Sequence, residues 1–236
     1  MNSQRFDLPV AVTLRLHTRS GKIDVTTEPR EDVLVEGDGF DATEADGGAA
    51  LDVRSGRGGS RPLSVRCPAG TDIVIGTQGG SIHMTGDFGT VSVTTMSGDI
   101  DVDTADEADL RTGSGTITLI GCRERCRLNS VSGTIKAGHV EAIAAGTMSG
   151  SISIERVGGK LKARTVSGSI TARLDGDGNI VVKTVSGKVH LELPEGTGLS
   201  TRFKTMSGKV RNPFPAGSDC HIEAMTISGS IELVPS

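Results

Sequence analysis

The chain repeats one short phrase, Thr-x-Ser-Gly-x-Ile, ten times within its 236 residues. Two clear copies are Thr95–Ile100 and Thr165–Ile170. From Gly80 to Gly229 the glycines of successive copies follow at steps of 18, 17, 18, 17, 18, 19, 21 and 21 residues. A period of this size predicts stacked structural units of one kind, so the repeat constrains the fold more than any other feature.

Apolar residues flank each copy at alternate positions. In one copy Val91 and Val93 precede the Thr, and Ile100 and Val102 follow the Gly. A period of two is typical of half-buried strands. Ser-Gly between two such runs indicates a sharp bend, because glycine adopts positive φ easily. A further apolar residue, Met96 in this copy, stands between Thr and Ser. Each unit is therefore predicted to be strand, bend, strand and loop.

A unit of this length cannot bury its apolar face alone, but stacked copies pair their strands in parallel around a shared core. The sequence therefore predicts an all-β, single-stranded parallel β-solenoid with coils of 17–21 residues. The crossover rule favours a right-handed coil. A left-handed helix of hexapeptides is the second alternative, and two or three sides per coil both stay open. Equivalent positions form structural ladders, which include Thr95, Ser97, Gly98, Ile100, Thr165, Ser167, Gly168 and Ile170.

The period divides the chain into two regions. Residues 1–70 contain one repeat unit followed by irregular strands that we expect to cap or flank the start of the stack. Residues 71–236 form the regular solenoid, which we predict to be one continuous domain. The last coil, Ser228–Leu233, precedes only three residues, so its outer edge has no evident cap. An uncapped strand edge invites pairing with another chain, which makes this C-terminal edge a candidate for self-association.

Composition speaks against several classes of function. The chain has no Trp, no Tyr and only five Phe, so it lacks the aromatic platforms on which sugars and single-stranded nucleic acids stack. Its net charge of −4 speaks against a nucleic-acid or membrane-surface protein. No apolar run is long enough to cross a bilayer. Residues 1–7 lack the basic and then apolar pattern of a secretory signal, so we expect a cytoplasmic protein.

No constellation of residues predicts catalysis or metal binding. Cys122 and Cys126 could supply two metal ligands, but Cys126 falls at an inward position and no further pair completes a set. The segment Asp175–Asn179 resembles the start of a calcium loop, yet Ile180 stands where an EF-hand requires Gly. Turn chemistry explains that segment better. We therefore expect no cofactor, no metal, no small-molecule substrate and no enzymatic activity.

Basic residues occupy outward positions of the later coils. Stacking in sequence order would gather them on one face, where they could bind an anionic partner such as a nucleic acid or an acidic surface. The alternative, which we favour, is a solubilising surface whose charges discourage strand-edge pairing. The residues of this candidate interaction face are Lys162, Arg164, Lys183, Lys188, Arg202, Lys204, Lys209 and Arg211.

The repeat resembles a known family. The pattern Val91-x-Val93-x-Thr95-x-Ser97-Gly98-x-Ile100-x-Val102, with the lead-in Leu63–Thr71, is similar to the bacterial β-strand-repeat family of unknown function labelled putative adhesins. The resemblance covers most of the chain. It implies a β-solenoid and carries no established activity and no catalytic residues.

We rank three functions. The first is a non-enzymatic scaffold whose rigid faces bind protein partners or support self-assembly. The second is a binding module for an anionic ligand on the basic face, with nucleic acid ranked below a protein partner. The third is a polysaccharide-cleaving solenoid enzyme, which ranks last because the loops are too short to wall a cleft.

Overall fold

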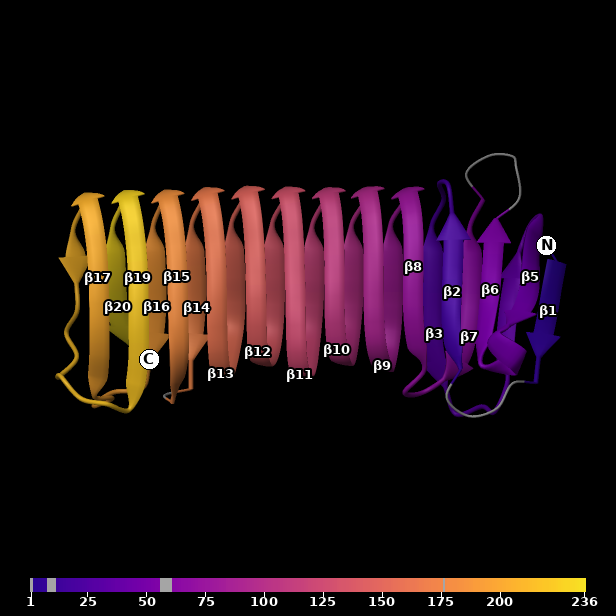
Figure 1. Ribbon diagram of the computed structural model, residues 1–236, viewed down its shortest axis with the longest axis horizontal. Helices are drawn as coiled ribbons and strands as arrows, with labels where there is room; N and C mark the ends of the chain where they lie inside the picture. Colours follow the sequence, from indigo (N-terminus) through magenta and orange to yellow (C-terminus); the bar gives the residue numbers. More distant parts are fainter. Residues whose placement is uncertain (1, 8–11, 56–60, 176) are drawn as a thin grey trace. The chain divides into compact units, whose positions relative to one another are not determined.

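The computed structural model describes residues 2–7, 12–55, 61–175 and 177–236 (Figure 1). It contains two compact units, Met1–Ile120 and Gly121–Ser236, which we call the N-terminal and C-terminal units. Within the described residues the one helical element is a short 3-10 turn, η1 (Asp46–Gly48). Everything else regular is strand, and the coils are about 18 residues long. The predicted β-solenoid is confirmed.

The described residues of the N-terminal unit form ten strands, and an eleventh strand contains the boundary between the units. They are β1 (Asn2–Phe6), β2 (Thr13–Thr18), β3 (Ile23–Glu28), β4 (Val33–Gly37), β5 (Phe40–Ala45), β6 (Ala50–Ser55), β7 (Leu63–Pro68), β8 (Asp72–Gly79), β9 (Ile82–Ser97), β10 (Ile100–Ser114) and β11 (Ile117–Ser132).

The coils of the N-terminal unit are not stacked in sequence order. Strand β2 lies between β6 and β8, and β3 lies between β7 and β9, all in parallel pairs (Figure 1). The first coil in sequence is thus the second in space. Antiparallel strands complete this end, with β5 on β6, β4 on β7 and β1 on β4. Reversed strands end the parallel stack and occupy the edges that further coils would need.

Nine of the described strands lie wholly within the C-terminal unit. They are β12 (Ile135–Ser149), β13 (Ile152–Ser167), β14 (Ile170–Leu174), β15 (Gly178–Ser186), β16 (Val189–Leu193), β17 (Leu199–Ser207), β18 (Val210–Arg211), β19 (Cys220–Ser228) and β20 (Ile231–Pro235).

The last coil of the chain is not the end of the stack. Strand β19 pairs in parallel with both β15 and β17, and β20 pairs with both β16 and β18 (Figure 1). The coil made by β19 and β20 is therefore inserted between two earlier coils. The expectation that the C-terminal coil offers a free edge is wrong, because both of its edges are already hydrogen-bonded. Among the described strands of this unit, the unpaired edge at this end belongs to β17 and β18 instead.

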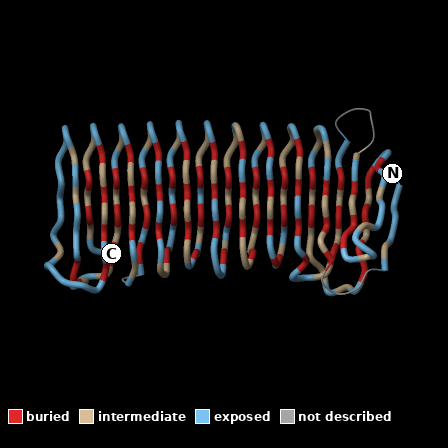
Figure 2. The backbone as a smooth tube through the Cα atoms, in the orientation of Figure 1, coloured by how far each residue is buried: buried red, intermediate tan, exposed pale blue. Residues whose placement is uncertain are grey.

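The core follows the predicted alternation (Figure 2). Ile100 and Ile170 are completely buried, and so are the inward apolar residues of the strands beside them. The Thr of each phrase points inward too: Thr95 and Thr165 are buried. The Thr165 hydroxyl donates to the carbonyl oxygen of Gly150 in the neighbouring coil over 3.2 Å. The Thr ladder therefore satisfies backbone carbonyls at the bend, where the strand hydrogen bonds are interrupted.

The Ser and Gly of the phrase form the bend itself. Ser97 and Ser167 are exposed. Gly98 and Gly168 have φ of +144° and +154°. A Cβ on Gly168 would lie 2.0 Å from the carbonyl oxygen of Gly150. Glycine is required here because the coils stack backbone against backbone.

Candidate interaction surfaces

The predicted basic residues all lie in the C-terminal unit, on two sides of its coils. Strands β13, β15 and β17 carry one group at equivalent outward positions, which are Lys162, Arg164, Lys183, Arg202 and Lys204. The second group, across the bend, consists of Lys188, Lys209 and Arg211.

The inserted coil places a carboxylate in the first group. Glu223 on β19 is in register with Arg202 of β17. Its Oε1 lies 3.1 Å from Nζ of Lys183 on β15. The hydrogen bond from Lys183 lowers the pKa of Glu223, and the nearby charge of Arg202 lowers it further. Stacking in sequence order would have put the cations of β15 and β17 side by side. The actual order separates them with an anion.

Glu232 on β20 likewise places a carboxylate among the cations of the second group. It is in register with His190 and Arg211 on the neighbouring strands. Its Oε2 lies 2.9 Å from Nζ of Lys188, and its Oε1 lies 3.6 Å from Nη1 of Arg211. The hydrogen bond from Lys188 is the main cause of the lowered pKa of Glu232. These two faces are therefore mixed in charge near the inserted coil.

Other members of the candidate face form no ion pair within 4 Å among the residues that the structure describes. They are Lys162, Arg164, Arg202, Lys204 and Lys209. The structure thus brings the eight residues onto common faces but interleaves them with Glu223 and Glu232. Whether the face binds a ligand stays a prediction.

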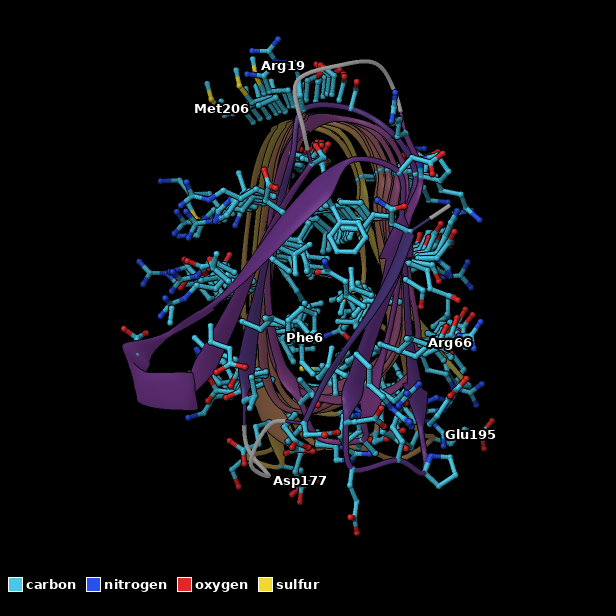
Figure 3. The ribbon with its side chains drawn as sticks, turned by 90° about the vertical axis from the view of Figure 1, so that its right-hand side faces the viewer. Phe6, Arg19, Arg66, Asp177, Glu195 and Met206 are labelled. Carbon is cyan, nitrogen blue, oxygen red and sulfur yellow. The ribbon has the colours of Figure 1, made fainter. Side chains whose placement is uncertain are left out.

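An apolar ridge follows the bend of the C-terminal unit, and sequence reasoning missed it. The residue between Thr and Ser in each phrase points outward, as Met206 does in Figure 3. In the C-terminal unit this residue is apolar in every phrase, and its exposure ranges from 42% for Val185 to 80% for Met206. The strand registers place five such residues on consecutive coils, in the spatial order Met148, Val166, Val185, Ile227 and Met206. We call these five residues the apolar ridge.

The signal for the ridge was present in the sequence. Because the Thr of each phrase is inward, strict alternation makes the next residue outward. An apolar residue at an outward position of every one of these coils is not needed for the core. Neighbouring parallel strands are about 4.8 Å apart, so the ridge is a continuous line of apolar side chains.

The cysteines are core residues, as predicted for Cys126. All four are buried and unbridged in the structure. Burial raises the pKa of Cys67 and Cys220 to about 11, so both thiols are protonated at neutral pH. Across the described ranges, no group of three or more His, Cys, Asp or Glu side chains is arranged to hold a metal ion.

Two further features of the sequence can be placed. In the segment that resembles the start of a calcium loop, Oδ1 of Asp175 lies 3.2 Å from Nε of Arg156 and forms an ion pair with it. Gly176 of that segment lies outside the described residues. Among the residues that are described, no helix is long and apolar enough to cross a membrane.

Stacked parallel coils, inward Thr and Ile ladders and Gly bends define the class of protein as a β-solenoid. Residues 18–232 match the family described as Toastrack DUF4097. The chain belongs to this family, which confirms the resemblance to a family of unknown function. A search of the curated proteins finds no match.

A solved structure shares the fold. A putative adhesin from Bacteroides fragilis is 14% identical, with a TM-score of 0.57, and the match covers 99% of this chain and 96% of that protein. A putative cell adhesion protein from Clostridium sporogenes is 11% identical, with a TM-score of 0.32, over 100% of this chain and 99% of that one. At 14% identity, the similarity to the Bacteroides fragilis protein shows a common fold and nothing more.

Proposed function

We propose that the chain is a non-enzymatic scaffold that binds a protein partner along the apolar ridge. The observation that carries this proposal is the exposure of five consecutive apolar side chains at one bend. The fold does not need them there, because the core residues on either side are already buried. Contiguous apolar surface on a soluble protein marks an interaction site more often than chance.

The surroundings of the ridge suit a protein partner. The exposed Ser ladder runs beside it and supplies hydroxyl groups that can donate or accept hydrogen bonds. An apolar centre with a polar rim is the usual composition of a protein interface. The Bacteroides fragilis protein of the same fold is described as a putative adhesin, which accords with a binding role.

The test changes the ridge without touching the core. We would attach the purified chain to beads, expose it to extract from its own cells and identify what it retains. The variant carries Val166→Lys and Val185→Lys, and Thr171→Lys on an outward position of β14 serves as the matched control. The proposal predicts a partner retained by the wild type and by the control but lost by the ridge variant. Retention of the same proteins by all three chains would contradict it.

A second candidate is binding of an anionic ligand by the basic residues. The absence of ion pairs for Lys162, Arg164 and Lys204 within the described part of the chain favours it. Mobility-shift assays at low salt, with nucleic acid and with acidic lipid vesicles, test it directly. Binding that disappears in a Lys162→Glu, Arg164→Glu variant would support this candidate, and a lack of binding by the wild type would exclude it.

A further inference from the structure

The C-terminal unit ends on an open strand edge. Strand β17 pairs with β19 on one side, and no described residue pairs with its other side between Ser200 and Ser207. Strand β18 likewise pairs only with β20 among the described strands. The inserted coil therefore leaves the coil of β17 and β18 as the last one in space, with one side unpaired.

The register identifies which backbone groups face outward. The N–H of Leu199 donates to the carbonyl of Pro215 over 2.9 Å, and Gly217 N–H donates to the carbonyl of Leu199 over 3.1 Å. Leu199 thus directs both backbone groups away from β19. Because these groups alternate sides along a strand, those of Thr201 and Phe203 face the same open side. They are donors and acceptors for a further strand.

Apolar side chains at this edge are covered on one side only. Phe203 is half-buried, whereas its neighbour in register, Ala224, is completely buried. Val210 is 43% exposed, whereas its neighbour Ile231 is completely buried. A further coil placed on this edge would bury both side chains and continue the core.

The charges at the edge select the kind of strand that fits. Arg202 and Arg211 stand at the outward positions of β17 and β18, and the strands on their occupied side present Glu223 and Glu232 in register. In these two existing strand pairs a glutamate therefore lies opposite each arginine, so a negative charge matches both positions. A second copy using the same edge would bring arginine and lysine from both chains together, and like charges across paired strands are destabilising.

We propose that the β17–β18 edge accepts an extended, acidic segment of a partner protein as an additional coil. The segment pairs with the backbone of β17, covers Phe203 and Val210, and places carboxylates opposite Arg202 and Arg211. This mode is β-strand addition, in which the main chain supplies affinity and the side chains supply specificity. The inference rests on the proposed scaffold function and names a second binding site for it.

The probe for this site comes from the chain itself. A synthetic peptide of residues 221–235 carries Glu223 and Glu232 at the spacing that already matches Arg202 and Arg211. Its binding to the full chain is measured by fluorescence anisotropy of a dye on the peptide. A second peptide with both glutamates replaced by lysine should bind at least about tenfold more weakly, because it reverses the charge match.

Two variants and one control locate the site. Thr201→Pro removes an outward N–H without affecting the pairing with β19, and Arg202→Glu with Lys204→Glu reverses the charge of the edge. Both should weaken peptide binding by about tenfold or more. The control, Lys136→Glu with Arg173→Glu, changes exposed outward positions on the interior strands β12 and β14 and should bind like the wild type. Circular dichroism and the thermal midpoint show that each variant is folded.

Three results would overturn the inference. One is no binding of the acidic peptide to the wild type. Another is equal binding to Thr201→Pro, because a peptide that displaced β19 and β20 would not need the Thr201 N–H. The third is a dimer of the wild type in light scattering that Thr201→Pro abolishes, which would mean that a second copy occupies the edge. The ridge variants of the scaffold test remain informative in each case, since they lie on a different surface.

Discussion

The Oε1 of Glu223 lies 3.1 Å from the Nζ of Lys183, although β16, β17 and β18 lie in the sequence between the two strands that carry these residues. This ion pair exists because β19 is inserted between β15 and β17. Insertion pairs both edges of the last coil, so the C-terminal strands cannot detach without breaking two ladders of hydrogen bonds. It also places an acidic coil between basic ones, where charges of opposite sign alternate across the strands.

The first prediction concerns the Gly ladder. A Cβ at Gly168 would overlap the carbonyl oxygen of Gly150, at a φ that side chains rarely adopt. We expect Gly168→Ala to lower the free energy of unfolding by about 3 kcal/mol, measured by urea denaturation. Gly196→Ala is the control, because Gly196 has φ of +79° but no neighbouring atom within 4 Å of the Cβ position. Gly196→Ala should lower the free energy of unfolding by only about 1 kcal/mol. Equal losses would mean that close stacking is not the reason for the ladder.

The second prediction concerns the Thr ladder. Thr165→Val keeps the shape of the buried side chain but removes the hydroxyl that donates to Gly150. The carbonyl then lacks this partner, and we expect a loss of about 1 kcal/mol in the free energy of unfolding. Thr165→Ser, which keeps the hydroxyl, should retain the hydrogen-bond contribution. Thr171→Val, at a half-buried outward position, is the control. A Thr165→Val chain as stable as the wild type would show that the ladder contributes no hydrogen-bond energy.

The third prediction concerns pH. Arg30 donates two hydrogen bonds of 2.9 Å to the carboxylate of Asp32, and Arg5 donates another. These hydrogen bonds, from Arg30 first, hold the pKa of Asp32 well below its ordinary value of 3.8. A carboxylate whose pKa is lowered by folding stabilises the fold fully when the pH is above its ordinary pKa. This contribution is lost as the pH falls from the ordinary pKa toward the folded-state pKa. The thermal midpoint should therefore drop as the pH is lowered from 5 through about 3.

Asp32→Asn tests the origin of that dependence. The variant should melt at a lower temperature than the wild type at neutral pH and should lose the acid-dependent part of the change. Glu31→Gln, at an exposed neighbouring position, should behave like the wild type. If the Asp32→Asn chain keeps the full acid dependence, other carboxylates must cause it.

The sequence predicts the cross-section of the coils well. Alternation around the phrase identifies which residues are inward, and Ile100 and Ile170 are buried as expected. Parallel pairing follows because only stacking can cover a face of that size. The inward positions follow from local alternation, and the parallel pairing follows from the repeat period. Both can therefore be found from a single sequence.

The order of the coils could not be predicted, because the ladder residues are the same in each coil. Ser186 could pair with Ser207 or with Ser228, and the structure uses Ser228. Both choices bury the same kinds of side chain and form the same hydrogen bonds. The outward charges are what differ: Glu223 and Glu232 complement basic neighbours, whereas sequence order would place cations together. The same degeneracy explains why the insertion of β2 between β6 and β8 was not foreseen.

The position of the inserted coil can be tested by disulfide trapping. Met225 on β19 is in register with Lys183 on one side and with Lys204 on the other. Adjacent parallel strands are about 4.8 Å apart, within reach of a disulfide, whereas strands two apart are separated by about twice that distance. In a chain whose four buried cysteines are replaced by alanine, Lys183→Cys with Met225→Cys should form an intramolecular disulfide under mild oxidation, detected by mass spectrometry. Lys183→Cys with Lys204→Cys should not. A disulfide in the second pair and none in the first would show that the coils stack in sequence order and would contradict the account.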